Sequence, residues 1–287
     1  MTAASSLSLR DLLSVGVARL RDAGSESPEL DAALLLGHAM HLSRASLYAH
    51  LPEAAPPARI DAFHDLLDRW ARGEPVAYLL GYKSFYDLTF AVTPDVLVPR
   101  PETELLVAWA AAWLDGRRCP ARVIDVGTGS GAIAVTVAHL VPGAAVVGVD
   151  ISRKAVRVAQ DNAGTAEVLG RVEFVVGDLL RWLGRPVDLI LANLPYLSDT
   201  QAESHDLRAE PTIALVGGDH DGFGLYRELI PQVVARLAPD GAFAFEIDPS
   251  QAEIAMAAVR DAWPTADASM HHDLAGHARF VTVCLDR

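Results

Sequence analysis

The residues best suited to chemistry form the segment Asn193-Leu194-Pro195-Tyr196, which directly follows a predicted buried strand. The Asn193 side-chain oxygen and the Leu194 backbone carbonyl can accept hydrogen bonds from the two N–H groups of a flat amide. Pro195 stiffens the loop, and the ring of Tyr196 offers a face on which that amide can stack. Because an amide nitrogen is a poor nucleophile, such positioning would favour its methylation without an ionisable base. A surface turn with a core tyrosine is the competing interpretation.

A glycine-rich turn, Gly127-Thr-Gly129-Ser-Gly131, lies between a predicted strand and a predicted helix. Glycines allow the backbone to turn sharply and to approach a ligand closely, and the helix start adds a positive dipole end. Asp150 ends the next predicted strand, about 20 positions further on, where a carboxylate can accept hydrogen bonds from ribose hydroxyls. The turn alone also fits a structural role, but together with Asp150 it favours a nucleoside-type ligand.

The glycine spacing helps to distinguish between cofactors. The dinucleotide fingerprint is Gly-x-Gly-x-x-Gly, with room for a pyrophosphate, whereas this turn has the spacing Gly-x-Gly-x-Gly and follows Asp125. A carboxylate beside the turn would repel a pyrophosphate but can help to hold an ammonium group, so the pattern favours S-adenosyl-L-methionine over NAD. Asp178, at the end of the third predicted strand, can accept a hydrogen bond from the adenine amino group, although an ordinary turn aspartate explains it equally well.

Strands and helices alternate from Pro101 onward, which predicts an α/β domain with a mostly parallel sheet and helices on both faces. The predicted strands cover residues 122–126, 144–149, 172–176, 187–192, 242–247, 265–270 and 279–285. The predicted helices cover residues 105–114, 132–140, 154–162, 226–237 and 251–262. Because open α/β sheets bind ligands at the carboxyl ends of their strands, we expect the two motifs to meet there.

The first third of the chain has a different organisation. Residues 1–75 show the apolar periodicity of a small helical bundle, with nothing that resembles a catalytic site. Residues 76–100 are rich in aromatic and β-branched side chains and predict an extended or hairpin connector. Residues 101–287 then form the α/β domain.

Composition excludes several classes of protein. The 37 acidic and 24 basic side chains give a formal charge of −13, which disfavours a general nucleic-acid binder. Cys119 and Cys284 lie far apart and the neighbours His271 and His272 point to opposite sides of the chain, so we predict neither a disulfide framework nor a metal site. The N-terminal stretch lacks the features of a secretory signal and the apolar runs are short, so we expect a soluble cytoplasmic protein.

Taken together, these residues resemble the glutamine N5-methyltransferases of the HemK/PrmC type, which modify peptide chain release factors. The resemblance covers nearly the whole chain. Its landmarks are Leu97-Val-Pro-Arg-Pro-Glu-Thr-Glu104, Glu74-Pro75, Asp125 to Gly131, Glu210-Pro211 with Ala214-Leu215, and Glu246-Ile247 with Gln251. One position departs from the usual Asn-Pro-Pro-Tyr, since Leu194 replaces the first proline. Leucine also provides a backbone carbonyl, so we expect activity to survive with a change in loop rigidity.

The resemblance implies a seven-stranded, Rossmann-like class I methyltransferase domain after an N-terminal helical domain for substrate recognition. It implies S-adenosyl-L-methionine as cofactor, S-adenosyl-L-homocysteine as product and release factors as protein partners, with no direct contact to nucleic acid or membrane. The glutamine in the Gly-Gly-Gln motif of the release factor would receive the methyl group on its side-chain nitrogen.

The resemblance also implies roles for individual residues. Catalysis would fall to Asn193, Pro195 and Tyr196. Cofactor binding would fall to Gly127, Thr128, Gly129, Ser130, Gly131, Asp150, Asp178, Leu179 and Asn193. Substrate binding would fall to Asn193, Leu194, Pro195 and Tyr196, with Arg100 in the wall of the site.

Three alternatives remain at this stage. A glutamine methyltransferase that acts on a ribosomal protein would share the same chemistry and differ mainly in its N-terminal domain. An adenine-N6 DNA methyltransferase also acts on a planar amine, but base flipping needs a cationic channel, which the charge of −13 disfavours. A binding module without turnover is the third, and intact Asn193, Pro195 and Tyr196 weigh against it.

Overall fold

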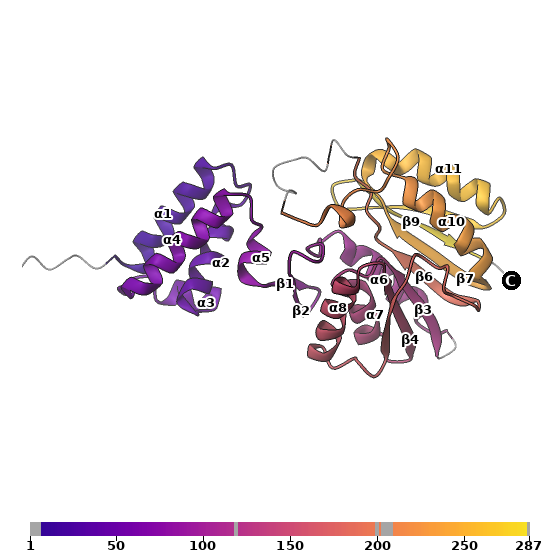
Figure 1. Cartoon of the computed structure of the whole chain (residues 1–287), viewed down its shortest axis with the longest axis horizontal. Coiled ribbons are helices and arrows are strands. Elements are labelled where there is room, and N and C mark those ends of the chain that lie inside the picture. Colours follow the sequence, from indigo (N-terminus) through magenta and orange to yellow (C-terminus); the bar gives the residue numbers. More distant parts are fainter. Residues whose placement is uncertain (1–6, 118–119, 199–200, 202–208, 286–287) are drawn as a thin grey trace, which may run out of the picture. The chain divides into compact units, whose positions relative to one another are not determined.

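The computed structural model describes residues 7–117, 120–198, 201 and 209–285. The chain divides into two compact units, Met1–Gly81 and Tyr82–Arg287, and each is described by itself. Figure 1 shows the helical first unit in indigo and violet and the α/β second unit in the remaining colours. Within the described ranges, no helix is both long and apolar enough to cross a membrane.

The first unit is the expected helical bundle. Its helices are α1 (Leu9–Asp22), α2 (Pro28–Met40), α3 (Arg44–Ala49), α4 (Pro57–Ala71) and α5 (Val76–Leu80). Helix α1 begins with a capping box, in which Ser8 and Asp11 satisfy each other's backbone N–H groups. A Cβ atom at Gly16 would lie 2.6 Å from Cζ of Phe63, so the glycine allows α1 and α4 to pack closely around that buried ring.

The segment expected to be an extended or hairpin connector begins instead as a helix. Pro75 directly precedes α5, and Gly81 ends it in the left-handed conformation with φ +79°. The buried Leu79 belongs to the core of the first unit, so the boundary between the units follows Gly81 rather than residue 75. The hairpin β1 (Tyr82–Phe85) and β2 (Leu88–Ala91) comes next, as expected for the later part of this segment.

The second unit is built on a seven-stranded sheet of order β5-β4-β3-β6-β7-β9-β8, which confirms the predicted α/β class. The strands are β3 (Ala121–Val126), β4 (Ala144–Asp150), β5 (Val172–Val176), β6 (Val187–Ala192), β7 (Leu237–Glu246), β8 (Asp267–His272) and β9 (Ala278–Cys284). The first five in spatial order are parallel, and β9 pairs antiparallel with both β7 and β8. The strand order reverses beside β3, between β4 and β6, which is where such sheets bind ligands.

Helices cover both faces of this sheet (Figure 1). They are α6 (Thr103–Leu114), α7 (Ala132–Leu140), α8 (Arg153–Thr165), α10 (Gly224–Arg236) and α11 (Ala252–Ala262), with two 3₁₀ turns, η2 (Thr212–Ala214) and η3 (Pro249–Gln251). Successive residues of β3 point to opposite faces. Val123 therefore packs with α6 and α7 in one core, and Ile124 packs with α10 and α11 in the other.

The buried side chain of Asn162 fastens the hairpin to the rest of the unit. The Asn162 side-chain oxygen accepts a hydrogen bond from the Ala91 backbone N–H at 2.7 Å. Its Nδ2 group donates to the Ala91 carbonyl at 3.0 Å and to the Ser130 carbonyl at 2.8 Å. Asn162 thus joins β2, α8 and the glycine-rich turn through three hydrogen bonds.

We expect Asn162→Ala to lower the free energy of unfolding by about 2–4 kcal/mol, because buried backbone groups would lose their partners. Urea denaturation of wild type and variant measures this change. Gln160→Ala, at an exposed position of the same helix, serves as the control. A loss for Asn162→Ala no larger than that of the control would contradict the role assigned to this side chain.

Candidate active site

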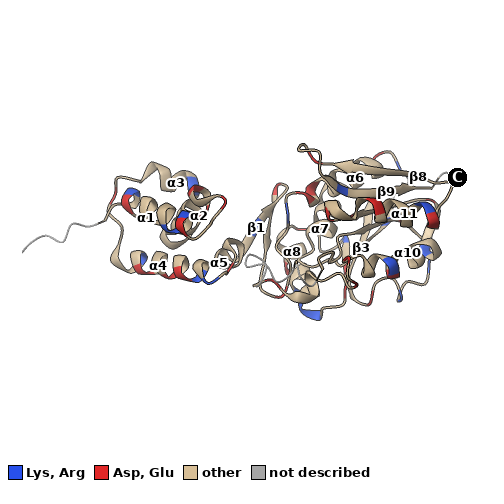
Figure 2. Cartoon of the chain, turned by 90° about the horizontal axis from the view of Figure 1, so that it is seen from above, with Lys and Arg blue, Asp and Glu red and all other residues tan. Residues whose placement is uncertain are grey.

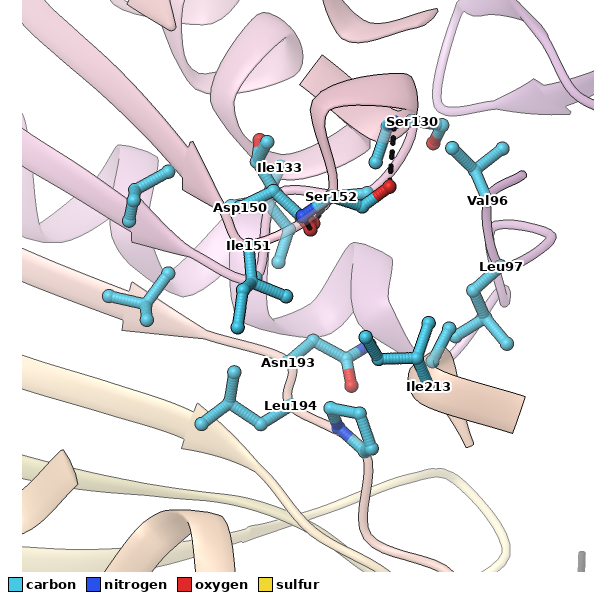
Figure 3. A pocket seen from close by; sticks show the side chains of 18 of the residues that line it. Val96, Leu97, Ser130, Ile133, Asp150, Ile151, Ser152, Asn193, Leu194 and Ile213 are labelled. Atoms are coloured by element: carbon cyan, nitrogen blue, oxygen red, sulfur yellow. Dashed lines mark hydrogen bonds between the residues drawn. The ribbon is translucent and has the colours of Figure 1, made fainter. Parts of the chain in front are cut away.

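A cavity of about 380 Å³ opens at the carboxyl ends of β3, β4, β5 and β6, all within the second unit. Its lining comes from five segments: residues 95–103, 126–133, 149–155, 177–179 and 193–195, completed by residues of η2 and its surroundings. Figure 3 shows Asp150, Ile151 and Ser152 on one side of this space, Asn193 and Leu194 on another, and Val96 and Leu97 opposite. The two motifs predicted from the sequence therefore meet in one cavity.

The glycine-rich turn forms one wall. Gly127, Gly129 and Gly131 all have positive φ angles, of +74°, +53° and +83°, which glycine adopts without strain. Gly127 to Ser130 line the cavity, but Gly131 does not. Gly131 instead precedes α7, where a Cβ atom would lie 3.1 Å from that of Ala159. Glycine is needed at position 131 for two reasons, the positive φ angle and the close packing of α7 against α8.

Asp150 holds the turn in place and still faces the cavity. Its carboxylate accepts hydrogen bonds from the backbone N–H groups of Gly129, at 2.9 Å, and Ser152, at 2.8 Å. Burial raises the pKa of Asp150, and these hydrogen bonds oppose that shift. Ile133 lies on the cavity wall and Ile151 on its lip with 60% of its surface exposed, so flat apolar surface borders the carboxylate.

Asp178 and Leu179 line the same end of the cavity. Asp178 is exposed and forms an ion pair with Arg181 at 2.9 Å. Leu179 has a positive φ of +48°, which turns the chain sharply after β5. Both residues therefore lie where a group bound beside Asp150 can reach them.

Asp125 is fully buried beneath the turn and does not line the cavity. It accepts hydrogen bonds from the Thr128 hydroxyl at 2.6 Å and from the Ala134 backbone N–H at 3.1 Å. Burial raises its pKa to about 7. The residue fixes the turn against α7, and its Oδ1 atom has no hydrogen-bond partner among the described residues. Its help in holding an ammonium group stays a prediction.

Asn193 presents an acceptor that the protein itself leaves unused. Its Nδ2 group donates to the Thr103 hydroxyl at 3.0 Å. Its Oδ1 atom is buried and has no hydrogen-bond partner within the described part of the chain. Figure 3 shows the Asn193 side chain at the cavity beside Leu194 and Ile213. An N–H donor bound in the cavity would satisfy this oxygen.

The rest of the Asn193–Tyr196 loop is held from several sides. Leu194 is buried and its backbone N–H donates to the Tyr226 hydroxyl at 3.1 Å. Leu194 and Pro195 line the cavity, whereas Tyr196 is not among its lining residues. Burial raises the pKa of Tyr196, so its hydroxyl stays neutral. The backbone carbonyl of Tyr196 accepts a hydrogen bond from Gln251 at 3.0 Å, and stacking of its ring on a substrate stays a prediction.

Gly217 and Gly222, in the segment before α10, also hold this loop. A Cβ atom at Gly217 would lie 2.4 Å from the Pro195 carbonyl oxygen, and one at Gly222 would lie 2.1 Å from that of Tyr196. Any side chain at these positions would push the loop away. The sequence alone predicts only a flexible turn over Gly217 to Gly222, because the contact with the Asn193–Tyr196 loop depends on the tertiary fold.

Arg100 lies in the cavity wall, as expected, and its partner was not foreseen. Arg100 forms an ion pair with the buried carboxylate of Glu210, which also accepts the Val98 backbone N–H at 3.2 Å. This contact joins the segment before α6 to the segment before η2. Ile213 on η2 completes the lip with 61% of its surface exposed. Sequence reasoning also missed Thr103 and Ser152 as lining residues, because neither type alone indicates a site.

Comparison with known proteins agrees with this geometry. The family model described as PrmC N-terminal domain matches residues 11–81, and the model described as methyltransferase domain matches residues 120–248. A release factor glutamine methyltransferase of Moorella thermoacetica is 42% identical, over 86% of this chain and 88% of its own. Those of Bordetella pertussis and Deinococcus radiodurans are 43% and 39% identical, over 88% and 96% of this chain and 93% and 98% of theirs. The chain belongs to the release factor glutamine methyltransferase family.

Solved structures show the same fold in the second unit. The ribosomal protein L11 methylase of Lactobacillus delbrueckii subsp. bulgaricus aligns with a TM-score of 0.50 and 22% identity, over 68% of this chain and 84% of its own. The hMettl16 catalytic domain aligns with a TM-score of 0.56 and 14% identity, over 70% of this chain and 77% of its own. At these identities the likeness establishes the class I methyltransferase fold alone.

The family uses S-adenosyl-L-methionine, and the residues of this cavity fit that cofactor. The glycine turn brings backbone close to the space, Asp150 offers a carboxylate to ribose hydroxyls, and Ile133 and Ile151 offer apolar faces to an adenine ring. Among the described residues, no group of three or more His, Cys, Asp or Glu side chains could hold a metal ion.

The raised pKa of Asp125 makes a prediction about stability. Since its folded pKa of about 7 exceeds its ordinary 3.8, the folded protein binds more protons than the unfolded chain between these values. The free energy of unfolding should therefore fall as the pH rises through this window. We expect Asp125→Asn to remove part of that fall, measured by urea denaturation at several pH values within this window and above it. Asp161→Asn, at an exposed position of α8, should leave it unchanged, and equal slopes in all three proteins would refute the assignment.

Proposed function

We propose that this chain transfers the methyl group of S-adenosyl-L-methionine to the side-chain amide nitrogen of the glutamine in the Gly-Gly-Gln motif of peptide chain release factors, in the cytoplasm. The observation that carries the proposal is the buried Oδ1 atom of Asn193, left without a partner at the end of β6. A primary amide carries two N–H donors. Asn193 Oδ1 and the Leu194 carbonyl would accept one each.

These two acceptors orient the substrate nitrogen. With both hydrogens held in the plane of the amide, the lone pair lies perpendicular to that plane and faces the bound cofactor, which supplies an electrophilic methyl group. The chain contributes position rather than a base, since proximity and orientation can supply several kcal/mol of barrier lowering. The methylated nitrogen then carries one surplus proton, which is strongly acidic and leaves to water.

The remaining wall limits the water in the site. Val96, Leu97 and Ile213 surround the approach to Asn193 with apolar side chains. A drier site strengthens the hydrogen bonds that hold the amide. The ion pair of Arg100 with the buried Glu210 holds this wall against the segment before η2.

A protein substrate agrees with the charge of the chain better than a nucleic acid does. The formal charge is −13. In Figure 2 the acidic and basic residues are interspersed on both units, and those drawn in colour do not gather into a basic band. We further propose that the helical first unit recognises the release factor. The PrmC N-terminal domain model matches this unit over residues 11–81, and the family resemblance implied the same role for residues 1–75.

Replacement of Asn193 tests the chemistry. We expect Asn193→Ala to lower methyl transfer to release factor by at least about a hundredfold, the cost of removing one well-placed polar partner in an active site. The assay follows label from S-adenosyl-L-methionine into release factor, with a factor whose Gly-Gly-Gln glutamine is replaced by alanine as the control. Label on the altered factor would move the target to another residue. Activity of Asn193→Ala within a few-fold of wild type would sink the proposed mechanism.

Removal of the first unit tests its role in recognition. A chain that begins at Tyr82 should still bind S-adenosyl-L-methionine, because every residue that lines the cavity lies in the second unit. It should lose methylation of intact release factor. Calorimetry of cofactor binding and the labelling assay measure the two properties separately. Undiminished methylation by the shortened chain would show that recognition lies elsewhere.

A further inference from the structure

Three polar side chains lie end to end behind the cavity. Asn193, just after β6, donates from Nδ2 to the hydroxyl of Thr103, the first residue of α6, at 3.0 Å. Thr103 donates from that hydroxyl to Oε2 of Glu246, the last residue of β7, at 2.6 Å. Thr103 and Glu246 are both buried. The chain of hydrogen bonds thus starts at a buried carboxylate and ends at the amide that faces the cavity.

The number of available protons fixes which group donates and which accepts in this series of hydrogen bonds. A hydroxyl has one proton to donate, and an ionised carboxylate can only accept. The Thr103 proton is therefore committed to Glu246, and the Thr103 oxygen can only accept from Asn193. That requires the nitrogen of the Asn193 amide on the Thr103 side, which leaves Oδ1 on the other side without a partner.

We propose that Thr103 and Glu246 are positioning residues that hold the Asn193 amide with its oxygen free to receive a substrate N–H. The inference deepens the proposed function and rests on it for the identity of the substrate group. It assigns to Thr103 and Glu246 an action on the substrate through the orientation of Asn193.

The reverse arrangement becomes possible once Glu246 carries a proton. The protonated carboxyl would donate to the Thr103 oxygen, and the Thr103 proton could then turn to Asn193. The Asn193 amide would favour the flipped orientation, with Nδ2 toward the cavity. A donor would then face the N–H groups of the substrate, which weakens binding because two donors cannot pair. Activity should therefore require an ionised Glu246.

Several groups around Glu246 set where it ionises. The pKa of Glu246 is raised to about 7. Burial is the largest cause and the neighbouring Glu102 adds to it, whereas the side-chain hydrogen bonds of Thr103 and Asn193 and the charge of Arg279 oppose it. Arg279 also forms ion pairs with two other carboxylates, Glu102 at 3.5 Å and Asp273 at 2.8 Å, so its charge does not act on Glu246 alone. The Tyr196 and Tyr226 hydroxyls also face this region and stay neutral, because burial raises the pKa of each. The switch in orientation would thus lie near neutral pH.

Enzyme kinetics provide the first test. We expect Thr103→Val and Glu246→Gln to lower kcat/KM for release factor by roughly tenfold to a hundredfold, the effect of one misdirected hydrogen bond. Wild type should lose activity as the pH falls through about 7, whereas Glu246→Gln should lack this limb because it cannot ionise. Thr103→Ser keeps the hydroxyl and should restore both the rate and the limb.

A matched control separates positioning from damage to the fold. Thr136 is buried in α7, and its hydroxyl has no hydrogen-bond partner within the described residues. Thr136→Val therefore makes the same substitution and leaves the hydrogen bonds between Asn193, Thr103 and Glu246 intact. All variants should bind S-adenosyl-L-methionine within a few-fold of wild type. A wild-type rate and acid limb in Glu246→Gln, or failure of Thr103→Ser to restore activity, would overturn the proposal.

The amide itself provides a second test that needs no substrate. The sequence contains only two asparagines, Asn162 and Asn193. In protein labelled with ¹⁵N at its asparagine side chains, the Asn193 NH₂ resonances should shift with pH around 7, and those of Asn162 should not. The shift should disappear in Glu246→Gln and persist in Thr136→Val. The inference would be refuted if the Asn193 NH₂ chemical shifts do not change with pH in wild type, or if they still change with pH around 7 in Glu246→Gln.

The two tests fail separately. If the amide signal behaves as expected but wild type transfers no methyl group to release factor, the proposed function is wrong and the orientation of Asn193 stands. If wild type methylates release factor and the amide signal does not titrate, the proposed function stands and the positioning role falls.

Discussion

A buried polar atom without a partner destabilises a folded protein by about 1–3 kcal/mol. The chain tolerates this cost at Asn193 Oδ1, and much of the surrounding structure keeps that atom in place and unsatisfied. The amide follows β6 at the point where the strand order of the sheet reverses. Thr103 occupies its nitrogen. A ligand that donates an N–H to this oxygen removes the penalty of the missing hydrogen bond, and that gain favours binding of an amide.

The loop around that amide is stiff for reasons that do not depend on proline alone. The usual family sequence has proline where this chain has Leu194, which raised the question of rigidity. In the structure, the Leu194 side chain is buried and its backbone N–H is bonded to Tyr226, a bond that proline could not make. Tyr226 in turn donates to the Glu246 carbonyl at 2.6 Å. Side-chain packing and hydrogen bonds therefore restrain the loop at position 194, where this chain lacks the proline ring of the usual family sequence.

The periodicity of the chain was sufficient to predict most of the fold. Alternating strands and helices, and the glycine turn between β3 and α7, predicted both the parallel sheet and the edge at which the site lies. The helix α5 was missed because Val76 and Tyr78 suit a strand as well as a helix, and its burial against the first core decided between them. Local sequence does not contain that information.

The site was predictable only where a residue type implied its own role. Asp150 and Asn193 lie in the cavity as expected. Asp125 does not, because the direction of its side chain depends on which face of β3 it occupies. The links between Arg100 and Glu210, and from Thr103 to Glu246, join residues more than a hundred positions apart. Such pairs depend on the tertiary fold, and a single sequence gives no measure of them.

The close approach of the two motifs limits how the chain can diverge. A Cβ atom at Gly127 would lie 2.7 Å from Cδ2 of Leu194. The Leu194 side chain therefore occupies the space that a Cβ atom at position 127 would need. Because Gly127 also has a φ of +74°, a side chain at position 127 would strain the backbone as well as crowd Leu194. Position 127 is therefore restricted to glycine, whereas the residue at 194 can change without a matching change at 127.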